Sequence, residues 1–147
     1  MKYIVGLGNE TRGDDGIGPK IVHYLLEQPP QEGFCAIDLA SNIWGLLPLL
    51  TENTQKILLI DCSYLGKSAG NFQFFSLKNI TDKKNKSIEN HELSLLQFIQ
   101  LVQKTDYKVP PFTLMGIEPE QVMLGSGLSV TIEKKVPFYA QQALDFL

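Results

Sequence analysis

Short apolar runs alternate along the chain with longer segments in which apolar and polar positions mix. The runs are brief, rich in β-branched or aromatic residues, and bounded by glycine or polar residues, which is typical of buried strands. They cover residues 2–7, 34–37, 56–61, 71–76 and 112–117. Between them, apolar side chains that recur every three to four positions predict helices from Pro19 to the Pro29-Pro30 pair, over 43–50, over 91–103 and over 128–147.

This alternation of strands and helices implies an α/β fold, with a mostly parallel sheet covered by helices on both faces. In such sheets, ligands bind beyond the carboxyl ends of the strands, where the strand order reverses. If the order begins with the second strand, then the first and then the third, this crevice lies between the first and third strands. The pattern therefore directs attention to polar residues that follow these two strands.

Two carboxylates and an imidazole occupy positions of this kind. Asp15 lies in Gly13-Asp14-Asp15-Gly16-Ile17-Gly18, just after the first predicted strand, and Asp61 closes the third. His91 begins the helix predicted over 91–103. If the three side chains converge, they make a site for a borderline transition metal such as nickel or zinc.

Each of these residues also has a structural explanation. A carboxylate at a helix N-terminus caps free N–H groups, and capping explains one acid of the Asp14-Asp15 pair but not both. Asp61 fits a simple strand boundary as well as a functional position, and His91 alone fits an ordinary helix start. His23, inside the first predicted helix, is assigned a structural role.

Other residues are expected at the same edge of the predicted sheet. Asp38 ends the second strand, and Glu118 follows the last one, where it lines the crevice or is merely solvated. The run Gly6-Leu7-Gly8-Asn9 begins like a dinucleotide fingerprint, but position 11 is threonine where the fingerprint requires glycine. We therefore expect no nucleotide cofactor, and we expect these glycines to form a tight turn or to allow close approach of a substrate.

Length and composition narrow the class of protein. The chain has 147 residues, which predicts a single domain over 1–147 with its own core. The net charge is −3 without a strong basic patch, which argues against nucleic acid as a partner. The first apolar run meets glycine too early for a signal peptide, and no run reaches membrane length, so we expect a cytoplasmic protein.

The cysteines and one polar stretch complete the picture. Cys35 and Cys62 form no CxxC pair, and both are expected to be reduced and packed inside strands. The stretch over 81–90 is polar and bears lysines, which is typical of a mobile loop. Because it leads directly into His91, we expect a binding partner to order this loop and so to position the histidine.

Taken together, these segments resemble the hydrogenase maturation endopeptidases. The matching pieces, in the family's order, are Gly6-Leu7-Gly8-Asn9, Arg12-Gly13-Asp14-Asp15-Gly16-Ile17-Gly18, Ile60-Asp61, Asn90-His91-Glu92-Leu93-Ser94, Gly116-Ile117-Glu118-Pro119 and Gly127-Leu128-Ser129. Each piece is weak alone, whereas the ordered set is specific. The resemblance implies a three-layer α/β/α sandwich around a mixed, mostly parallel five-stranded sheet with one antiparallel strand.

The resemblance also implies an activity. The family's members remove a short C-terminal extension from the precursor of a nickel–iron hydrogenase large subunit, so this precursor is the expected partner. Nickel arrives with the precursor, and the family binds it through two acids and a histidine that fall on Asp15, Asp61 and His91. These three residues are therefore the candidate catalytic and metal-binding residues. Some members have glutamate where Asp15 stands.

In the family, an acid that ends the second strand is tied to substrate handling, and it falls on Asp38. Together with Gly6, Gly8 and Asn9, it forms the candidate substrate-binding set. Two alternatives of other classes remain open at this point: a non-proteolytic chaperone that senses nickel in the large subunit, and a zinc-dependent hydrolase of small substrates. No serine or cysteine nucleophile with a partner histidine forms a recognisable motif.

Overall fold

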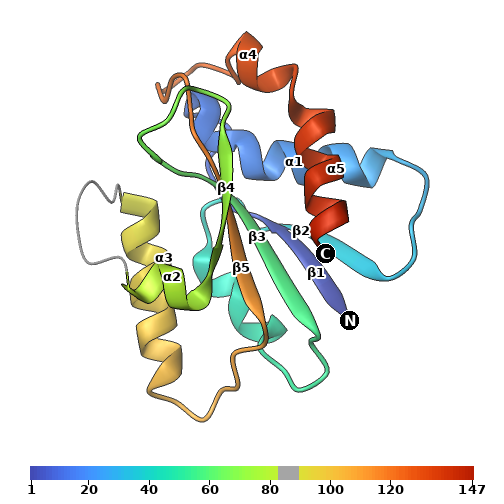
Figure 1. Cartoon of the computed structure of the whole chain (residues 1–147), viewed down its shortest axis with the longest axis vertical. Helices are drawn as coiled ribbons and strands as arrows, with labels where there is room; N and C mark the ends of the chain where they lie inside the picture. Colours follow the sequence, from blue (N-terminus) through green and yellow to red (C-terminus); the bar gives the residue numbers. More distant parts are fainter. Residues whose placement is uncertain (83–89) are drawn as a thin grey trace.

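The computed structural model describes the backbone of residues 1–82 and 90–147, and the side chains of residues 1–80 and 95–147. It contains a five-stranded sheet in the order β2-β1-β3-β5-β4. The strands are β1 (Lys2–Gly6), β2 (Phe34–Asp38), β3 (Lys56–Cys62), β4 (Phe72–Ser76) and β5 (Phe112–Ile117). All neighbouring strands are parallel except β4 and β5 (Figure 1). The predicted mixed sheet and its 2-1-3 beginning are confirmed.

Helices cover both faces of the sheet (Figure 1). One face carries α1 (Ile17–Glu27), α4 (Val130–Glu133) and α5 (Val136–Phe146), and the other carries the 3-10 helix η2 (Ile43–Leu49) and α3 (Asn90–Gln103). The short 3-10 helix η1 (Gly13–Gly16) precedes α1, and α2 (Leu77–Asp82) follows β4. In the part of the chain that is described, none of these helices has the length and apolar character needed to cross a membrane.

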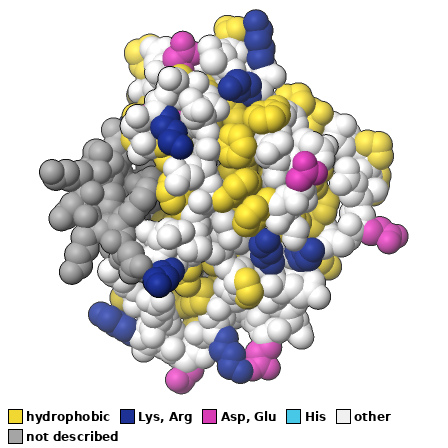
Figure 2. All heavy atoms as spheres, in the orientation of Figure 1, with side chains coloured by type: hydrophobic (Ala, Val, Ile, Leu, Met, Phe, Trp, Pro, Cys, Tyr) yellow, Lys and Arg dark blue, Asp and Glu magenta, His cyan; other side chains and the backbone are white. Residues whose placement is uncertain are grey.

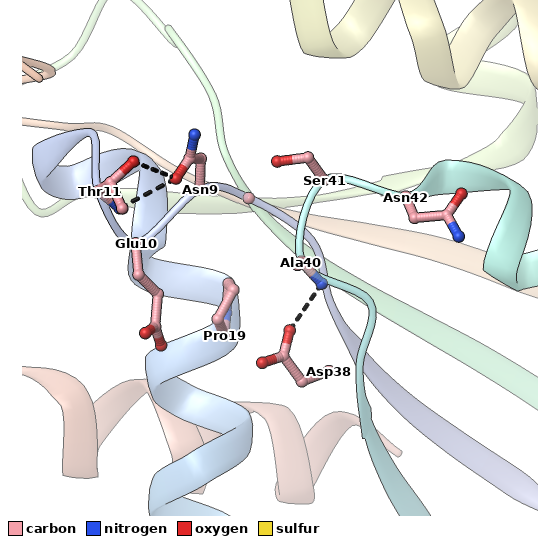
Figure 3. A pocket seen from close by; sticks show the side chains of 9 residues that line it. Asn9, Glu10, Thr11, Pro19, Asp38, Ala40, Ser41 and Asn42 are labelled. Atoms are coloured by element: carbon pink, nitrogen blue, oxygen red, sulfur yellow. Dashed lines mark hydrogen bonds between the residues drawn. The ribbon is translucent and has the colours of Figure 1, made fainter.

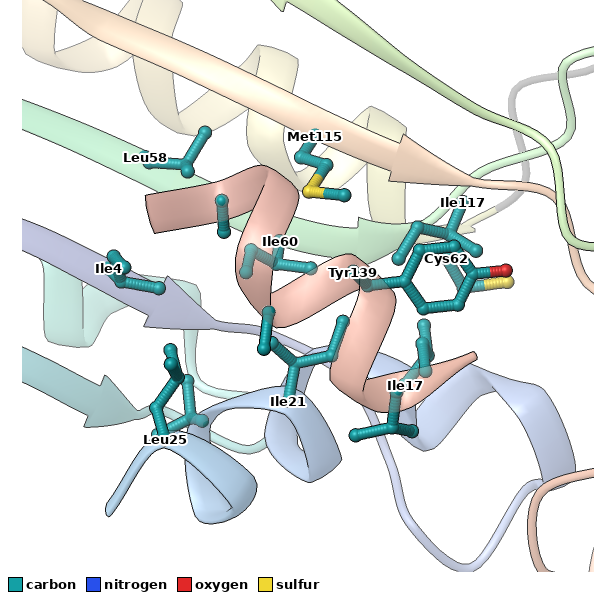
Figure 4. Close-up of a cluster of buried hydrophobic side chains, with 14 of the residues drawn as sticks. Ile4, Ile17, Ile21, Leu25, Leu58, Ile60, Cys62, Met115, Ile117 and Tyr139 are labelled. Carbon is teal, nitrogen blue, oxygen red and sulfur yellow. The ribbon is translucent and has the colours of Figure 1, made fainter. Parts of the chain in front are cut away.

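The layer formed by α1 and α5 is joined to the sheet by a continuous apolar core (Figure 4). Ile4 of β1, together with Leu58 and Ile60 of β3, meets Ile21 of α1 and Tyr139 of α5 there. None of these side chains is accessible to solvent. The apolar stripe predicted for the first helix is therefore the surface that covers the sheet.

The opposite face of the sheet uses the intervening residues of the same strands. Val5, Ile57 and Leu59 pack with Leu46 of η2 and Leu95 of α3. Side chains alternate between the two faces along a strand, so a central strand covered on both sides must be apolar at every position. This requirement explains why the strands appear in the sequence as unbroken apolar runs.

The helix predicted over 128–147 is wrong in its extent, because two helices, α4 and α5, occupy this region. Pro137 explains the break. It has no N–H with which to continue a hydrogen-bond ladder from α4, but its fixed φ suits the first turn of a new helix. The segment predicted as helical over 43–50 is a 3-10 helix, and it contains Pro48.

Two further predictions need correction. The loop predicted over 81–90 is wrong at both ends, since Thr81 and Asp82 complete α2 and Asn90 begins α3, while 83–89 lie outside the described residues. Cys62 is buried as expected, but Cys35 is exposed. The reason is the place of β2 at the edge of the sheet, where its side chains are only partly covered.

The other edge strand, β4, is attached to α5 by aromatic contacts. Phe72 meets Phe138 and Tyr139 edge-on, with ring centroids 5.8 Å and 6.1 Å away. Phe74 stacks on Phe146 with its ring centroid 4.2 Å away. Hydrophobic side chains also gather over β4 and α5 on the face of the molecule shown in Figure 2. These contacts hold the antiparallel edge of the sheet against the last helix.

Candidate functional site

The loop that follows β1 is shaped by Gly8, which has a φ of +142°. A Cβ atom at this position would lie 1.9 Å from the backbone oxygen of Asp15. Only glycine, which has no Cβ, allows the loop to lie this close to η1. The Gly8 backbone therefore sets the path by which Asp15 reaches the carboxyl edge of the sheet.

Asp15 is buried in η1, with 6% of its surface exposed. Its Oδ2 accepts a hydrogen bond from the backbone N–H of Asn9 at 3.0 Å. Asn9 is itself fixed by a turn, since its Oδ1 accepts the backbone N–H and the hydroxyl of Thr11 at 3.0 Å and 2.6 Å. The Asp15 carboxylate is thus oriented by the loop that joins β1 to η1.

Asp61 lies near the carboxyl end of β3 and is 1% exposed. Its Oδ1 accepts the backbone N–H of Cys62 at 2.8 Å. Residues on one face of a strand are two positions apart, so Asp61 continues the row of Ile57 and Leu59 and faces the layer that contains α3. Because β1 and β3 are parallel neighbours, the loop that carries Asp15 begins beside the end of the strand that carries Asp61.

His91 is the second residue of α3. This helix leads into β5, which is parallel to β3, so α3 begins towards the carboxyl edge of the sheet. The backbone of all three candidate ligands therefore lies at this edge, and the His91 side chain falls outside the described residues. Two carboxylates held at one edge attract a cation, and an imidazole would add a nitrogen ligand suited to nickel or zinc.

Asp14 has a different role from its neighbour. It is buried, and its carboxylate accepts four hydrogen bonds, from the backbone N–H groups of Glu120, Gln121 and Ser129 and from the Ser129 hydroxyl, at 2.7–2.9 Å. Neither η1 nor α1 has a side-chain cap. The four hydrogen bonds of Asp14 go to residues 120–129, so this acid attaches a distant loop to η1.

A cavity of about 640 Å³ lies beside the loop after β1 (Figure 3). It is lined by Gly8, Asn9, Glu10, Thr11, Pro19, Asp38, Ala40, Ser41 and Asn42. Three members of the predicted substrate-binding set thus come together here. The fourth, Gly6, lies against α1, where a Cβ would meet the Gly18 oxygen at 2.5 Å. The absence of a side chain at Gly6 lets the helix pack closely on β1.

Asp38 is connected to both walls of this cavity. Its Oδ1 accepts the backbone N–H of Ala40 at 2.7 Å. Its Oδ2 lies 2.8 Å from Nε2 of His23, whose Nδ1 lies 3.2 Å from Oε1 of Glu10. Glu10, His23 and Asp38 have ligand atoms close enough together to hold a metal ion. The structural role assigned to His23 from its helical position is thus incomplete, because its two partners come from other elements.

Glu118 is buried at the same edge, and its carboxylate accepts the backbone N–H of Leu65 in the loop after β3. Nearby, Tyr139 donates a hydrogen bond from its hydroxyl to the Gly70 carbonyl at 2.7 Å. Burial, and then the negative charge of Asp14, raise the pKa of Tyr139 to about 12. Both residues stabilise loops around the candidate site by hydrogen bonds to the backbone.

Comparisons with known proteins agree with this architecture. The model of the protein family HycI, hydrogenase maturation protease, matches residues 19–146 of this chain. MJ0253 of Methanocaldococcus jannaschii, which bears the name of a hydrogenase maturation protease, is 27% identical over 134 residues, covering 90% of this chain and 87% of its own.

Two solved structures show how closely the fold agrees. The hydrogenase maturating endopeptidase HybD of E. coli superposes with a TM-score of 0.83 and 22% identity, covering 99% of this chain and 91% of its own. The [NiFe] hydrogenase maturation protease HybD of Thermococcus kodakarensis has a TM-score of 0.80 and 25% identity, covering 99% and 97%. The whole described architecture, including the edge that carries the candidate acids, is therefore shared with these proteins.

Proposed function

This chain belongs to the hydrogenase maturation protease family and is therefore a peptidase, and we propose that its substrate is the precursor of a nickel–iron hydrogenase large subunit. In this proposal it removes the precursor's C-terminal extension once nickel has been inserted. The reaction takes place in the cytoplasm, where an exposed thiol such as that of Cys35 stays reduced.

The observation that carries the proposal is the pair of buried, oriented carboxylates at the carboxyl edge of β1 and β3. Asp15 and Asp61 each accept a hydrogen bond from a backbone N–H, at 3.0 Å and 2.8 Å. Such hydrogen bonds fix the direction of a metal ligand before the metal arrives. With the imidazole of His91, the two acids provide an open set of ligands for nickel that the precursor brings.

This arrangement would let the enzyme test whether its substrate is ready. Carboxylate ligands bind a divalent cation strongly because the cation's charge complements their own. A precursor that carries nickel supplies this cation, whereas a nickel-free precursor does not. Nickel thus acts here as part of the substrate, and cleavage depends on its presence.

The cavity beside Asp15 suits an extended peptide. Asn9 lies on one wall and Asp38 on the other, so a chain lying between them would pass close to Asp15, whose carboxylate accepts the Asn9 N–H. The polar side chains of Ser41 and Asn42, which also line the cavity, can pair with the peptide's own N–H and C=O groups. We propose that this cavity holds the segment next to the scissile bond.

The test is to incubate the purified protein with large-subunit precursor prepared with and without nickel, and to follow the precursor's mass. The loaded precursor should lose its C-terminal extension, and the nickel-free form should stay intact. Asp61→Asn should leave both forms uncut. Asp106→Asn, which changes an exposed acid between α3 and β5, is the matched control and should cut at the wild-type rate.

Other outcomes would contradict particular parts of the proposal. Equal shortening of the two precursors would remove the dependence on nickel. Tight binding of the loaded precursor without shortening would favour a nickel-sensing chaperone. One firmly held zinc ion per chain in elemental analysis would favour a zinc hydrolase, because an open site with two carboxylates should retain little metal during purification.

A further inference from the structure

His23 has a different acidic partner at each nitrogen of its ring. Nδ1 lies 3.2 Å from Glu10 Oε1, and Nε2 lies 2.8 Å from Asp38 Oδ2. Glu10 belongs to the loop after β1 and Asp38 ends β2, and both residues line the cavity. The imidazole therefore bridges two elements that stand on opposite sides of the proposed peptide path.

This double contact requires a particular protonation state. A neutral imidazole has one N–H and one lone pair, so it donates to only one carboxylate and turns its lone pair towards the other. The protonated ring donates from both nitrogens. The bridge between Glu10 and Asp38 is therefore complete only when His23 is an imidazolium.

A series of hydrogen bonds leads from this bridge to the candidate acid site. Asp38 Oδ1 accepts the N–H of Ala40 at 2.7 Å, and the Ala40 carbonyl accepts the N–H of Gly8, also at 2.7 Å. The next N–H, that of Asn9, is donated to Asp15 at 3.0 Å. Ala40 has a left-handed φ of 48°, which is strained for a residue with a Cβ. Asp38 stabilises this turn by accepting the Ala40 N–H, which requires that its carboxylate keeps the orientation it has beside His23.

We propose that His23 is a positioning residue for substrate binding. As an imidazolium it holds Asp38 and Glu10 at the cavity, and through Asp38 it maintains the turn at Ala40 and the loop that orients Asp15. This inference rests on the proposed role of the cavity in binding the precursor. It adds that binding depends on the protonation of His23.

The charged surroundings of the ring agree with this role. Among the described residues, Glu10 and Asp38 are the charged groups that pair with His23 from packed elements, and α5 contributes no such pair. On its own helix, Lys20 and Glu27 lie one turn away on either side and are exposed. The side chain of His23 is 44% exposed, so water screens the bridge and its effect on affinity should be modest.

The first test does not depend on catalysis. The chain has two histidines, so His91→Ala leaves His23 as the only imidazole. Its ring nitrogens can then be followed by nitrogen-15 NMR as the pH is varied. Both nitrogens should carry protons at acidic pH, and loss of the proton should shift the amide signals of Ala40 and Gly8. Glu10→Gln should reduce this pH-dependent shift of the Ala40 and Gly8 signals. Glu27→Gln, the matched control, should leave the shift unchanged.

The second test uses cleavage of nickel-loaded precursor. KM should rise as the pH is raised through the His23 titration measured by NMR, with most of the change in KM rather than in kcat. His23→Gln should raise KM about two- to fivefold at acidic pH, in the range expected for an exposed ion pair. His23→Arg, a permanent cation that can donate to both acids, should restore KM and remove its dependence on pH.

Three results would overturn the inference. The first is a His23 ring that titrates without any change at Ala40 or Gly8. The second is a KM that follows pH identically in wild type and in His23→Arg. The third is binding of added Zn²⁺ or Ni²⁺ to the His91→Ala variant that shifts the His23 nitrogens and is lost in Glu10→Gln, because the three side chains would then be a metal site. Failure of wild-type protein to cut any precursor would contradict the proposed function and leave the NMR result intact.

Discussion

Asp14 and Asp15 are adjacent in the chain, share one short 3-10 helix and are both buried, yet their surroundings differ. The Asp14 carboxylate accepts four hydrogen bonds from residues 120–129. The Asp15 carboxylate accepts the N–H of Asn9, a close neighbour in the chain, and lies at the end of β1 and β3. One acid holds the fold around the site, and the other is a candidate for the chemistry.

The comparison teaches that burial and proximity do not identify a functional acid. A carboxylate whose oxygens are fully used by backbone and hydroxyl donors is already compensated, so it has little capacity for a metal. Burial of Asp14 therefore signals stability. The distinction can be tested by giving each acid the same small substitution and asking whether activity or stability is lost.

The largest effect is expected from Asp15→Asn. The amide keeps the shape of the side chain and an oxygen that accepts the Asn9 N–H, so the fold should stay within about 1 kcal/mol of wild type. Cleavage of loaded precursor should fall about a thousandfold or more, because a proposed ligand loses its charge. The measurements are the rate of precursor shortening by mass and the midpoint of thermal unfolding. A variant that cuts at near wild-type rate would show that Asp15 is not a ligand.

Asp14→Asn should have the reverse effect. Its Oδ2 accepts three of the four hydrogen bonds, and an amide must place a donor group where one carboxylate oxygen stood. The free energy of unfolding should fall by about 2–4 kcal/mol, because buried donors are left without a charged acceptor. Urea unfolding measures this, with Asp106→Asn as the exposed control. Unchanged stability together with lost cleavage would reverse the roles given to the two acids.

The smallest effect concerns Tyr139, whose pKa responds to burial and then to the Asp14 charge. In the unfolded chain a tyrosine ionises at its ordinary pKa of about 10, whereas the folded pKa is raised to about 12. The native state then keeps a proton that the unfolded state loses, so wild-type stability should fall as the pH rises from about 10 to 12. Tyr139→Phe should cost about 1 kcal/mol near neutral pH by losing the bond to the Gly70 carbonyl.

The check on Tyr139 is urea unfolding at a series of alkaline pH values. Subtracting the Tyr139→Phe curve from that of wild type removes the common contribution of the lysines. The difference should shrink and then change sign as the pH rises above about 10, because only in wild type does unfolding release the Tyr139 proton. A constant difference across this range would show that Tyr139 does not titrate as its surroundings indicate.

The fold could be predicted from the sequence to the extent that it depends on local patterns. Apolar runs that end in glycine or aspartate marked the strands, and a central sheet buried on both faces follows from them. The break between α4 and α5 also had a local cause in Pro137, although the apolar stripe on either side concealed it. The exposure of Cys35 follows from the place of β2 at the edge of the sheet, a consequence of the strand order that the expectation of a packed thiol did not take into account.

The site could be predicted only in part, for a related reason. The positions of Asp15 and Asp61 at strand ends follow from the general rule for ligand sites in α/β sheets. The role of Asp14 does not, because its hydrogen-bond donors lie 106–115 residues away in the chain. His23 was given a structural role because it lies inside a helix, while its partners come from β2 and the loop after β1. Contacts at long sequence separation leave no local pattern to interpret.

The attachment of residues 120–129 to Asp14 also has a consequence for the order in which the protein becomes active during synthesis. A ribosome completes β1, η1 and even the whole of β3 long before Ser129 leaves the exit tunnel. Until then the Asp14 carboxylate lacks the hydrogen-bond donors that compensate its burial. As a result, η1 and the adjoining Asp15 cannot reach their final positions. A nascent protease should therefore remain inactive towards its substrate until residues 120–129 have emerged.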